Sequence, residues 1–456
     1  MDLKKSKQNK WFALKAIVIV FLAVTVNSCS NDDDELEIVA NQDVTRFDAV
    51  VVTEWYDLIK ILTTETVGYT PPVAARAFGY TGVALYESMQ YGMPDNTSLK
   101  GKITDFNPRL SNIDGQDIYW PLVANATLAE MTKYFYNNTT PARYQAVLEL
   151  EARFNDEARA LISATSFEQS LALSKDVTDQ IISYSLNDGG HNAQFRNFPT
   201  DYNPPSGPEF WVPTPPNFAR ALQPYWGSNR PFLTANVEST QPAPPPPYST
   251  DPASIFYERA LEVYNTVENV TPEQVVIAQF WSDDPVTTAT PPGHSISILN
   301  QLIRENNTNL AESSIAFGKL GMGIADAFIS CWKTKYDTNY LRPITYIRNN
   351  IDANWDTILE TPPFPEYTSG HSVQSGALAE LMTDMFGDNY TFTDRTHEDR
   401  TDIDGTPRTY STFYEMANEA ALSRLYGGIH YNEAIFLGLE QGYDIGRNIN
   451  SLDLSN

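Results

Sequence analysis

Residues 320–343 read LGMGIADAFISCWKTKYDTNYLRP, and the spacing of their apolar side chains predicts the core helix of an α-helical protein. Three apolar side chains share one face of this helix with Lys335: Ile324, Phe328 and Cys331. A lysine that points into a core is costly unless an anion meets it, although its long side chain can also reach solvent. The segment therefore indicates a buried helix that ends close to a possible anion site.

Arg342 follows Lys335 by about two helical turns, so it can project the same way if the helix continues. Pro343 biases Arg342 away from helical geometry, which would place the guanidinium at the helix end. Cys331 lies in the apolar stretch, and we interpret it as a buried, inert thiol.

Helical periodicity recurs along most of the chain, whereas no run of alternating β-branched residues and no internal repeat stands out. We therefore predict an all-α fold of two packed helical bundles. The segments with apolar residues at helical spacing cover about 46–66, 73–89, 117–136, 141–163, 167–186, 253–267, 272–282, 294–305, 309–336, 372–387, 409–426 and 432–448.

The composition is that of a globular protein, with 42% hydrophobic and 12% aromatic residues among 456. The formal net charge of −26 argues against nucleic acid as a partner, because phosphate contacts need a basic surface. In so acidic a chain, a local cluster of Lys and Arg is informative.

The N-terminus has the pattern of an export signal, with several lysines followed by a short apolar run from Ala16 to Val26. Cys29 follows this run as the acylated cysteine of a bacterial lipoprotein would, and an acidic tether comes next. We predict a signal peptide over 1–28, a tether over 29–45, and an exported protein anchored to the outer membrane through lipid on Cys29.

Three further divisions follow from the pattern of helices and proline. Residues 46–200 are expected to form an N-terminal helical bundle, and residues 253–456 a C-terminal bundle that carries the site. Between them, residues 201–252 are rich in proline, asparagine and aromatics, and we interpret them as an extended excursion over the surface.

A second polar segment, Ser369-Gly370-His371, stands immediately before a helical run. Ser369 is a plausible N-cap residue, and Gly370 lets the backbone approach a ligand closely. Free N–H groups at a helix N-terminus can bind an anion, and His371 could exchange a proton with it. The simpler alternative is a capped helix with an exposed histidine.

A third segment joins Arg424 to His430 through the glycine pair Gly427-Gly428. Arg424 continues an apolar helical face, so a second cation is directed inward. The glycines are expected to end the helix and to let His430 turn back toward Arg424. A neutral imidazole there is a candidate metal ligand or nucleophile.

Taken together, the three segments resemble the signature of vanadium-dependent haloperoxidases and the type-2 phosphatidic acid phosphatase superfamily. This signature has the form Lys-x6-Arg-Pro, Pro-Ser-Gly-His and Ser-Arg-x5-His-x3-Asp. The chain departs from it at Thr368, which replaces proline, and at Ala434, which replaces aspartate. Segments beginning at Pro71, Trp281 and Thr290 are similar to bacterial secreted members, whose fold is two four-helix bundles.

The resemblance implies a vanadate cofactor, bound to His430 through an imidazole nitrogen. It implies that His371 and Lys335 are catalytic and that Trp332 and Phe364 lie at the halide pocket. It further implies oxyanion contacts from Lys335, Arg342, Ser369, Gly370 and Arg424. Hydrogen peroxide and a halide, iodide or bromide before chloride, would be the substrates, and hypohalous acid the product.

Because Ala434 takes the aspartate position, we hypothesise that Glu433 or a backbone carbonyl holds the second ring nitrogen of His430. His294 is interpreted as part of a structural turn, and His397 as part of a solvated acidic loop in preference to a metal site, because the loop does not fit the calcium-binding pattern.

Two other functions use the same residues differently. A phosphomonoesterase would use His430 as nucleophile and His371 as acid. A helical lipoprotein that captures ligands at the outer membrane would need neither. The sequence sets neither the oligomeric state nor the halogen acceptor.

Overall fold

A computed structural model describes residues 42–455, so the expected signal peptide and Cys29 lie outside the described residues. The α-helices are α2 (Val50–Glu65), α3 (Pro71–Met89), α4 (Trp120–Phe135), α5 (Pro141–Arg159), α6 (Ala164–Ser185), α7 (Ala235–Glu238), α8 (Ile255–Glu268), α9 (Pro272–Phe280), α10 (Thr290–Glu305), α11 (Leu310–Thr338), α12 (Pro343–Asn350), α13 (Gly370–Phe386), α14 (Phe413–Tyr426) and α15 (Asn432–Asn450). Four 3-10 turns are η1 (Val44–Arg46), η2 (Gln90–Gly92), η3 (Ala193–Phe195) and η4 (Trp226–Ser228). The two strands are β1 (Phe392–Asp394) and β2 (Arg408–Tyr410).

Local sequence explains where many of these helices begin. Proline occupies the first turn of α3, α5, α9 and α12, where its missing N–H has no helical partner to lose. Thr271 and Gln274 form a reciprocal capping box on α9. The Ser369 hydroxyl accepts a hydrogen bond from the Ser372 amide at 3.3 Å and so caps α13.

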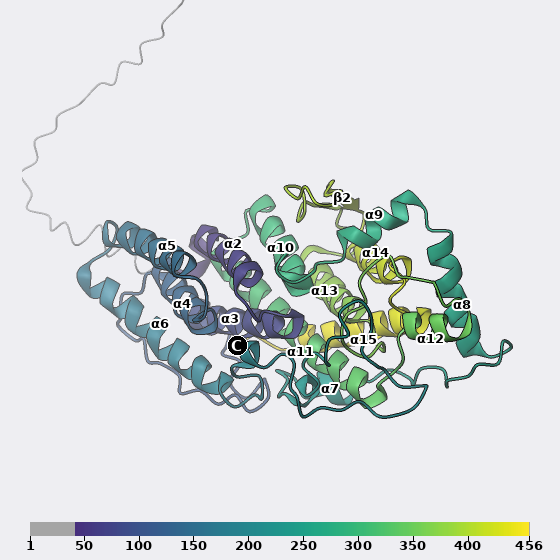
Figure 1. The fold of residues 1–456 in the computed structure, drawn as a ribbon. Helices are drawn as coiled ribbons and strands as arrows, with labels where there is room; N and C mark the ends of the chain where they lie inside the picture. Colours follow the sequence, from purple (N-terminus) through teal and green to yellow (C-terminus); the bar gives the residue numbers. More distant parts are fainter. Residues whose placement is uncertain (1–41, 456) are drawn as a thin grey trace, which may run out of the picture.

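The long helix α11 is the centre of the molecule and joins the two groups of helices (Figure 1). It packs along α3 on one side, and α3 and α4 connect it to α5 and α6 at one end of the molecule. On its other side it packs against α13 and α15, which contact α14. The expected all-α fold of two packed bundles is confirmed. The boundaries proposed for the bundles remain predictions.

Helix α11 is long and apolar enough to cross a membrane, but 89% of its most apolar window is buried inside the protein. Within residues 42–455 it is the one helix with this property. Its apolar character is that of a core helix.

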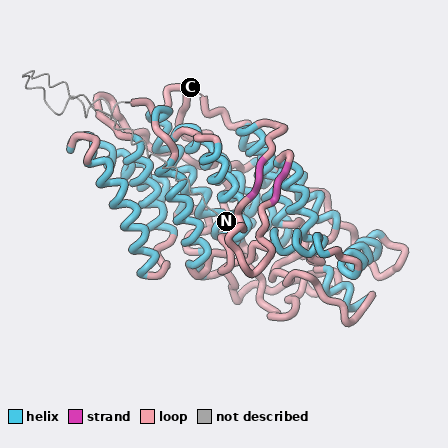
Figure 2. The backbone as a smooth tube through the Cα atoms, turned by 90° about the horizontal axis from the view of Figure 1, so that it is seen from above, coloured by secondary structure: helices cyan, strands magenta, loops and turns pink. Residues whose placement is uncertain are grey.

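The strands form a short antiparallel hairpin in which Thr393 pairs with Thr409, seen in magenta in Figure 2. No strand was expected here, because three-residue strands carry too little alternation to be recognised. The short helices α7 and α12 were not expected either, for the same reason of length.

The proline-rich segment 201–252 is extended, as expected, but it lies on the surface only in part. Its buried apolar residues include Trp211, Leu222, Trp226 and Phe232. The carboxylate of Asp326 in α11 accepts hydrogen bonds from the amides of Phe232 and Leu233 at 2.7 and 2.9 Å. The segment is therefore fastened to the central helix.

Candidate active site

The chain reverses direction between Lys335 and Arg342. Helix α11 ends at Thr338, and Asn339 adopts a left-handed conformation with φ of 47°. Arg342 is the extended N-cap residue of α12, so the helix does not continue to it, and the expectation that Pro343 holds Arg342 out of helical geometry is confirmed. The reversal nevertheless brings the guanidinium back toward the end of α11, because Arg342 and Lys335 both bind the segment 364–366.

Three cationic side chains are buried together without a carboxylate partner. Lys335 and Arg342 are 0% exposed and Arg424 is 2% exposed. Within residues 42–455 none of them forms an ion pair, although the surface carries many. Buried charges without a direct ion pair are costly, and the carboxylates of Glu366 and Asp284 act on them only from beyond ion-pair distance, so this arrangement indicates a place for a small anion.

The contacts of these cations go to uncharged groups. The Lys335 ammonium donates to the carbonyl oxygens of Pro365 and Glu366, both at 2.9 Å. Arg342 donates to the Phe364 and Ile429 carbonyls at 2.9 and 2.8 Å, and one terminal nitrogen has no partner. Arg424 donates to the Ala278 carbonyl at 2.9 Å and to its neighbour Ser423 at 2.9 Å.

Burial lowers the pKa values of all three cations. It lowers the pKa of Lys335 to about 7, and the nearby charge of Arg342 adds to this effect. Burial also lowers the pKa of Arg342 and of Arg424 to about 10 each, which leaves both guanidinium groups charged at neutral pH. A bound anion would favour the charged form of Lys335.

Two hydrogen bonds define the tautomer of His430. Its Nε2 atom lies 3.2 Å from the Arg342 guanidinium, which can only donate, so Nε2 is the acceptor. Its Nδ1 atom lies 2.8 Å from the Glu366 carboxylate and therefore carries the proton. Burial, together with Arg342 and Lys335, holds the pKa of His430 well below its usual range. A neutral imidazole thus presents a lone pair beside the cations.

Glu366 is a site residue that the sequence did not reveal, and it replaces the hypothesised Glu433. Glu433 forms an ion pair with Arg259 instead, so that hypothesis is wrong. Glu366 is 0% exposed, and the same carboxylate oxygen accepts from the Tyr431 amide at 2.9 Å. Glu366 and Ala434 line the same small cavity. The carboxylate of Glu366 therefore lies close to the position where the family motif has its aspartate, although it comes from a different segment of the chain. The one signal in the sequence was an acidic residue three positions before Ser369.

The second motif lies at the N-terminus of α13, as expected. The Ser369 amide donates to the Ala434 carbonyl at 3.0 Å, which ties this turn to the start of α15. Gly370 faces Trp332, and a β-carbon there would lie 3.7 Å from the indole. His371 is partly buried, and its Nε2 atom has no hydrogen-bond partner within the described residues. Burial and then the charge of Arg424 hold the pKa of His371 well below its usual range.

Two aromatic rings cover Lys335. The rings of Trp332 and Phe364 lie 5.0 Å apart, and the Lys335 ammonium is 6.0 and 5.0 Å from their centroids. The Arg342 guanidinium is also 5.0 Å from the Phe364 ring. The indole N–H donates to the Leu222 carbonyl at 3.2 Å, so the proline-rich segment holds Trp332 in place. The structure thus brings the expected halide-pocket residues beside the cations, and their role remains a prediction.

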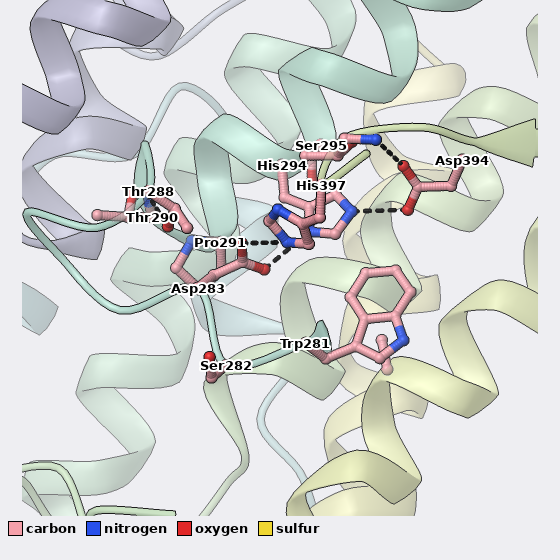
Figure 3. Close-up of polar contacts among 12 residues, drawn as sticks. Trp281, Ser282, Asp283, Thr288, Thr290, Pro291, His294, Ser295, Asp394 and His397 are labelled. Atoms are coloured by element: carbon pink, nitrogen blue, oxygen red, sulfur yellow. Dashed lines mark hydrogen bonds and ion pairs between the residues drawn. The ribbon is translucent and has the colours of Figure 1, made fainter. Parts of the chain in front are cut away.

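A second polar cluster was missed altogether. His397 is 2% exposed, so its assignment to a solvated loop is wrong. It lies beside Asp283 and His294, and His294 is not simply part of a turn but forms buried ion pairs from the first turn of α10 (Figure 3). The acidic composition of residues 394–405 favoured a solvated loop. The buried partners of His397 come from distant segments of the chain, so the sequence did not show them.

An all-α fold that encloses unpaired cations beside a neutral imidazole defines an oxyanion-binding helical protein. Residues 316–453 match the model of the second helical-bundle domain of vanadium chloroperoxidase. The solved structure described as the first bacterial vanadium-dependent iodoperoxidase is similar with a TM-score of 0.82 and 32% sequence identity, over 90% of this chain and 97% of that one. The chain belongs to the vanadium-dependent haloperoxidase family, as the sequence predicted.

More distant members agree in fold. A holo-type bacterial vanadium-dependent chloroperoxidase superposes with a TM-score of 0.59 at 13% identity, over 92% of this chain and 95% of that one. The vanadium chloroperoxidase of Curvularia inaequalis is 23% identical over 374 residues, or 68% of this chain. That match spans 61% of the fungal protein's own length.

The residues present fit a vanadate ion. Vanadate is a tetrahedral oxyanion with the shape of phosphate, and the site offers three unpaired cations, an unpartnered Arg342 nitrogen and the N-terminus of α13. Imidazole Nε2 of His430 is the one neutral nitrogen whose lone pair is directed at the Arg342 guanidinium. Lys335, Arg342, Arg424, Ser369, Gly370 and His430 are therefore the residues that would hold it.

Proposed function

We propose that this protein is a vanadate-dependent haloperoxidase that oxidises iodide or bromide with hydrogen peroxide to hypohalous acid. The observation that carries the proposal is the neutral His430, fixed by Glu366 and facing three buried cations that form no ion pair within residues 42–455. The similarity to a bacterial iodoperoxidase supports iodide as the first halide to test.

When bound, vanadate would act as a Lewis acid that activates peroxide toward halide. Lys335, Arg342 and Arg424 would neutralise the oxyanion in a site from which water is largely excluded. The Gly370 amide at the start of α13 would donate to it, and Glu366 would keep Nε2 of His430 unprotonated.

His371 is suited to move the peroxide proton. Its depressed pKa keeps the imidazole neutral, so it can accept a proton, and its unpartnered Nε2 lies in the partly buried turn beside Gly370. Trp332 and Phe364 would form the apolar side of the halide position, next to the Lys335 ammonium. An aromatic wall suits a large, weakly hydrated halide better than a strongly hydrated one.

The test is iodide and bromide oxidation by the purified protein with hydrogen peroxide, before and after addition of orthovanadate. We expect turnover that requires vanadate and is lost in His430→Ala. The control is His191→Ala, because His191 contacts Tyr134 in the N-terminal group of helices, away from the site. Turnover without vanadate, or unchanged turnover in His430→Ala, would contradict the proposal.

Hydrolysis of an aryl phosphate in the same preparation tests the phosphatase alternative. Ala434 no longer argues against it, because Glu366 supplies a carboxylate to His430. Hydrolysis that vanadate inhibits, without halide oxidation, would assign the protein to the phosphatase branch. No turnover in either assay would favour a ligand-capturing lipoprotein, whose function would not depend on His430.

We also propose that the chain is exported and anchored to the outer membrane by lipid on Cys29. The lysine-rich start, the apolar run 16–26 and the cysteine after it support this proposal. Radiolabelled palmitate should be incorporated by the wild-type chain and not by Cys29→Ser.

A further inference from the structure

A second site lies beside the oxyanion pocket, where Asp283, His294, His397 and Asp394 are brought together from three segments. Asp283 follows α9, His294 lies near the start of α10, and Asp394 ends β1 shortly before His397. All four side chains are at most 2% exposed. The catalytic proposal uses none of them, so a buried group of two carboxylates and two imidazoles needs its own explanation.

His294 lies between the two carboxylates (Figure 3). Its Nδ1 atom is 2.8 Å from Asp283, and its Nε2 atom is 2.7 Å from Asp394. The Trp281 indole stacks on the imidazole with ring centroids 4.5 Å apart, which fixes the plane of the ring. Asp394 is itself held by the Thr396 amide at 2.9 Å.

The remaining contact in the group is an ion pair between His397 and Asp283. Nε2 of His397 lies 3.2 Å from the second carboxylate oxygen of Asp283, and neither atom has another hydrogen-bond partner within residues 42–455. Asp283 also adopts a left-handed backbone conformation with φ of 48°, which is costly for a residue other than glycine. An ion between these two atoms could bind both of them without the loss of any other hydrogen bond.

Charge balance indicates that the partner is a cation. Within residues 42–455 the carboxylates of Asp283 and Asp394 form ion pairs with histidines and with no lysine or arginine. A divalent ion would balance the two carboxylates and leave both imidazoles neutral. Nε2–H of His294 would still donate to Asp394, which is the arrangement of a metal-binding histidine held by an outer carboxylate.

The ligand atoms come within reach of one zinc ion after a shift of the side chains. One ligand atom each from Asp283, His294 and His397 lies within 4.8 Å of the others. Zinc bonds of about 2.0–2.1 Å in a tetrahedron separate ligand atoms by roughly 3.3 Å, so the three atoms have to close around the ion. The contacts of 2.8 Å to His294 and 3.2 Å to His397 use different oxygens of Asp283, so its carboxylate has to turn to present one oxygen to the metal. Two imidazoles favour zinc over calcium or magnesium, which prefer oxygen ligands.

The site opens on one side. The three side chains line a pocket of about 370 Å³ together with residues of α2 and α10. A water molecule from this pocket could complete the coordination, as in zinc sites with three protein ligands. We propose that Asp283, His294 and His397 bind one divalent transition-metal ion of the zinc class, with Asp394 as the residue that orients His294.

This site would stabilise the wall of the oxyanion pocket. Residues 281–284 link the two sites, because the Trp281 backbone contacts His371 and the Asp284 carboxylate attracts Arg424. A metal ion on Asp283 would therefore fix the segment that positions both residues. Binding of zinc itself does not depend on the proposed haloperoxidase activity and is tested without it.

The experiment is titration of the metal-stripped full chain with Zn²⁺ by calorimetry in buffers of different ionisation enthalpy, with metal analysis of the product. We expect one ion per chain and release of a proton on binding, because His294 must deprotonate. His397→Gln and Asp283→Asn should lose binding by more than Asp394→Asn, whose expected loss is about 10–100-fold as for an outer partner. His191→Gln is the matched control and should bind normally.

Thermal unfolding separates loss of the site from loss of the fold. Zn²⁺ should raise the unfolding temperature of the wild type and of His191→Gln, and should leave that of His397→Gln unchanged. Each variant should unfold cooperatively without metal. Absence of saturable binding to the wild type would overturn the proposal, and so would equal binding by the wild type, His397→Gln and Asp283→Asn.

Discussion

Glu366 accepts a hydrogen bond from Nδ1 of His430 at 2.8 Å, while Arg342 approaches Nε2 of the same ring at 3.2 Å. A guanidinium cannot accept a hydrogen bond, so the carboxylate and the cation together select one neutral tautomer. The lone pair that results faces the unpaired cations. Glu366 comes from the segment before α13, whereas the family motif places its aspartate after the histidine, at the position of Ala434.

Removal of this acceptor should weaken vanadate binding. Glu366→Leu leaves Nδ1 of His430 without a partner, and we expect about a 10–100-fold loss of vanadate affinity, as for other outer partners of a metal ligand. Glu366→Gln should lose less, because the Tyr431 amide keeps the glutamine oxygen turned toward His430. Calorimetric titration with orthovanadate measures both. Glu433→Gln is the control, and an equal loss there would contradict the assignment.

Vanadate binding should depend on pH through Lys335. Without an anion its pKa is about 7, so the side chain is charged below this pH and neutral above it. Affinity should therefore fall as the pH rises through 7, with the midpoint shifted upward by the bound anion. Lys335→Met should bind more weakly and lack this step, and the difference between the two curves cancels the titration of vanadate itself. Parallel curves would exclude Lys335 as the titrating group.

Lys335 should also make the free energy of unfolding depend on pH when vanadate is absent. Its pKa falls from 10.5 in the unfolded chain to about 7 in the folded one, so between these values the unfolded chain binds more protons. The free energy of unfolding should then rise with pH across this window. Denaturant titrations of the wild type and Lys335→Met, both free of vanadate, would show it. A rise of equal size in both proteins would assign the effect to other groups.

Sequence periodicity predicted the long helices because each buries one continuous face over several turns. The same logic failed for α12, which has eight residues, and for the hairpin of β1 and β2, whose strands have three each. Short elements are fixed by their tertiary neighbours and leave almost no periodic signal.

Motif spacing identified most of the residues that the structure brings together around His430, because they lie within three short segments. It could not identify Glu366, whose partner His430 is 64 residues away in the chain. His397 was misjudged for the same reason, since its neighbour Asp283 belongs to a different segment. Spatial pairing of single residues from separate segments is outside what one sequence shows.

The Phe364 ring should govern both halide oxidation and the titration of Lys335. Phe364→Leu removes the ring face that lies 5.0 Å from the Lys335 ammonium and from the Arg342 guanidinium. Loss of about 1–2 kcal/mol of cation–π attraction should lower kcat/KM for iodide roughly tenfold or more. The same loss disfavours the charged form of Lys335, so the vanadate-binding midpoint should shift to lower pH. Phe364→Tyr keeps the ring and should shift neither quantity. An unchanged pH midpoint in Phe364→Leu would contradict this account.

The close packing of α3 against α11, which joins the two groups of helices, depends on the absence of a side chain at Gly82. A β-carbon there would lie too close to the Phe317 carbonyl oxygen of α11, a backbone atom that cannot move independently. Gly82→Ala should lower the free energy of unfolding by about 1–3 kcal/mol, as for an overpacked core. Gly318→Ala is the matched control on the facing helix, where the nearest atom is the Tyr86 β-carbon at 3.2 Å. Its loss should stay below about 1 kcal/mol, because alanine also favours the helix over glycine. Equal losses in urea unfolding would show that α3 and α11 can separate slightly at no greater cost.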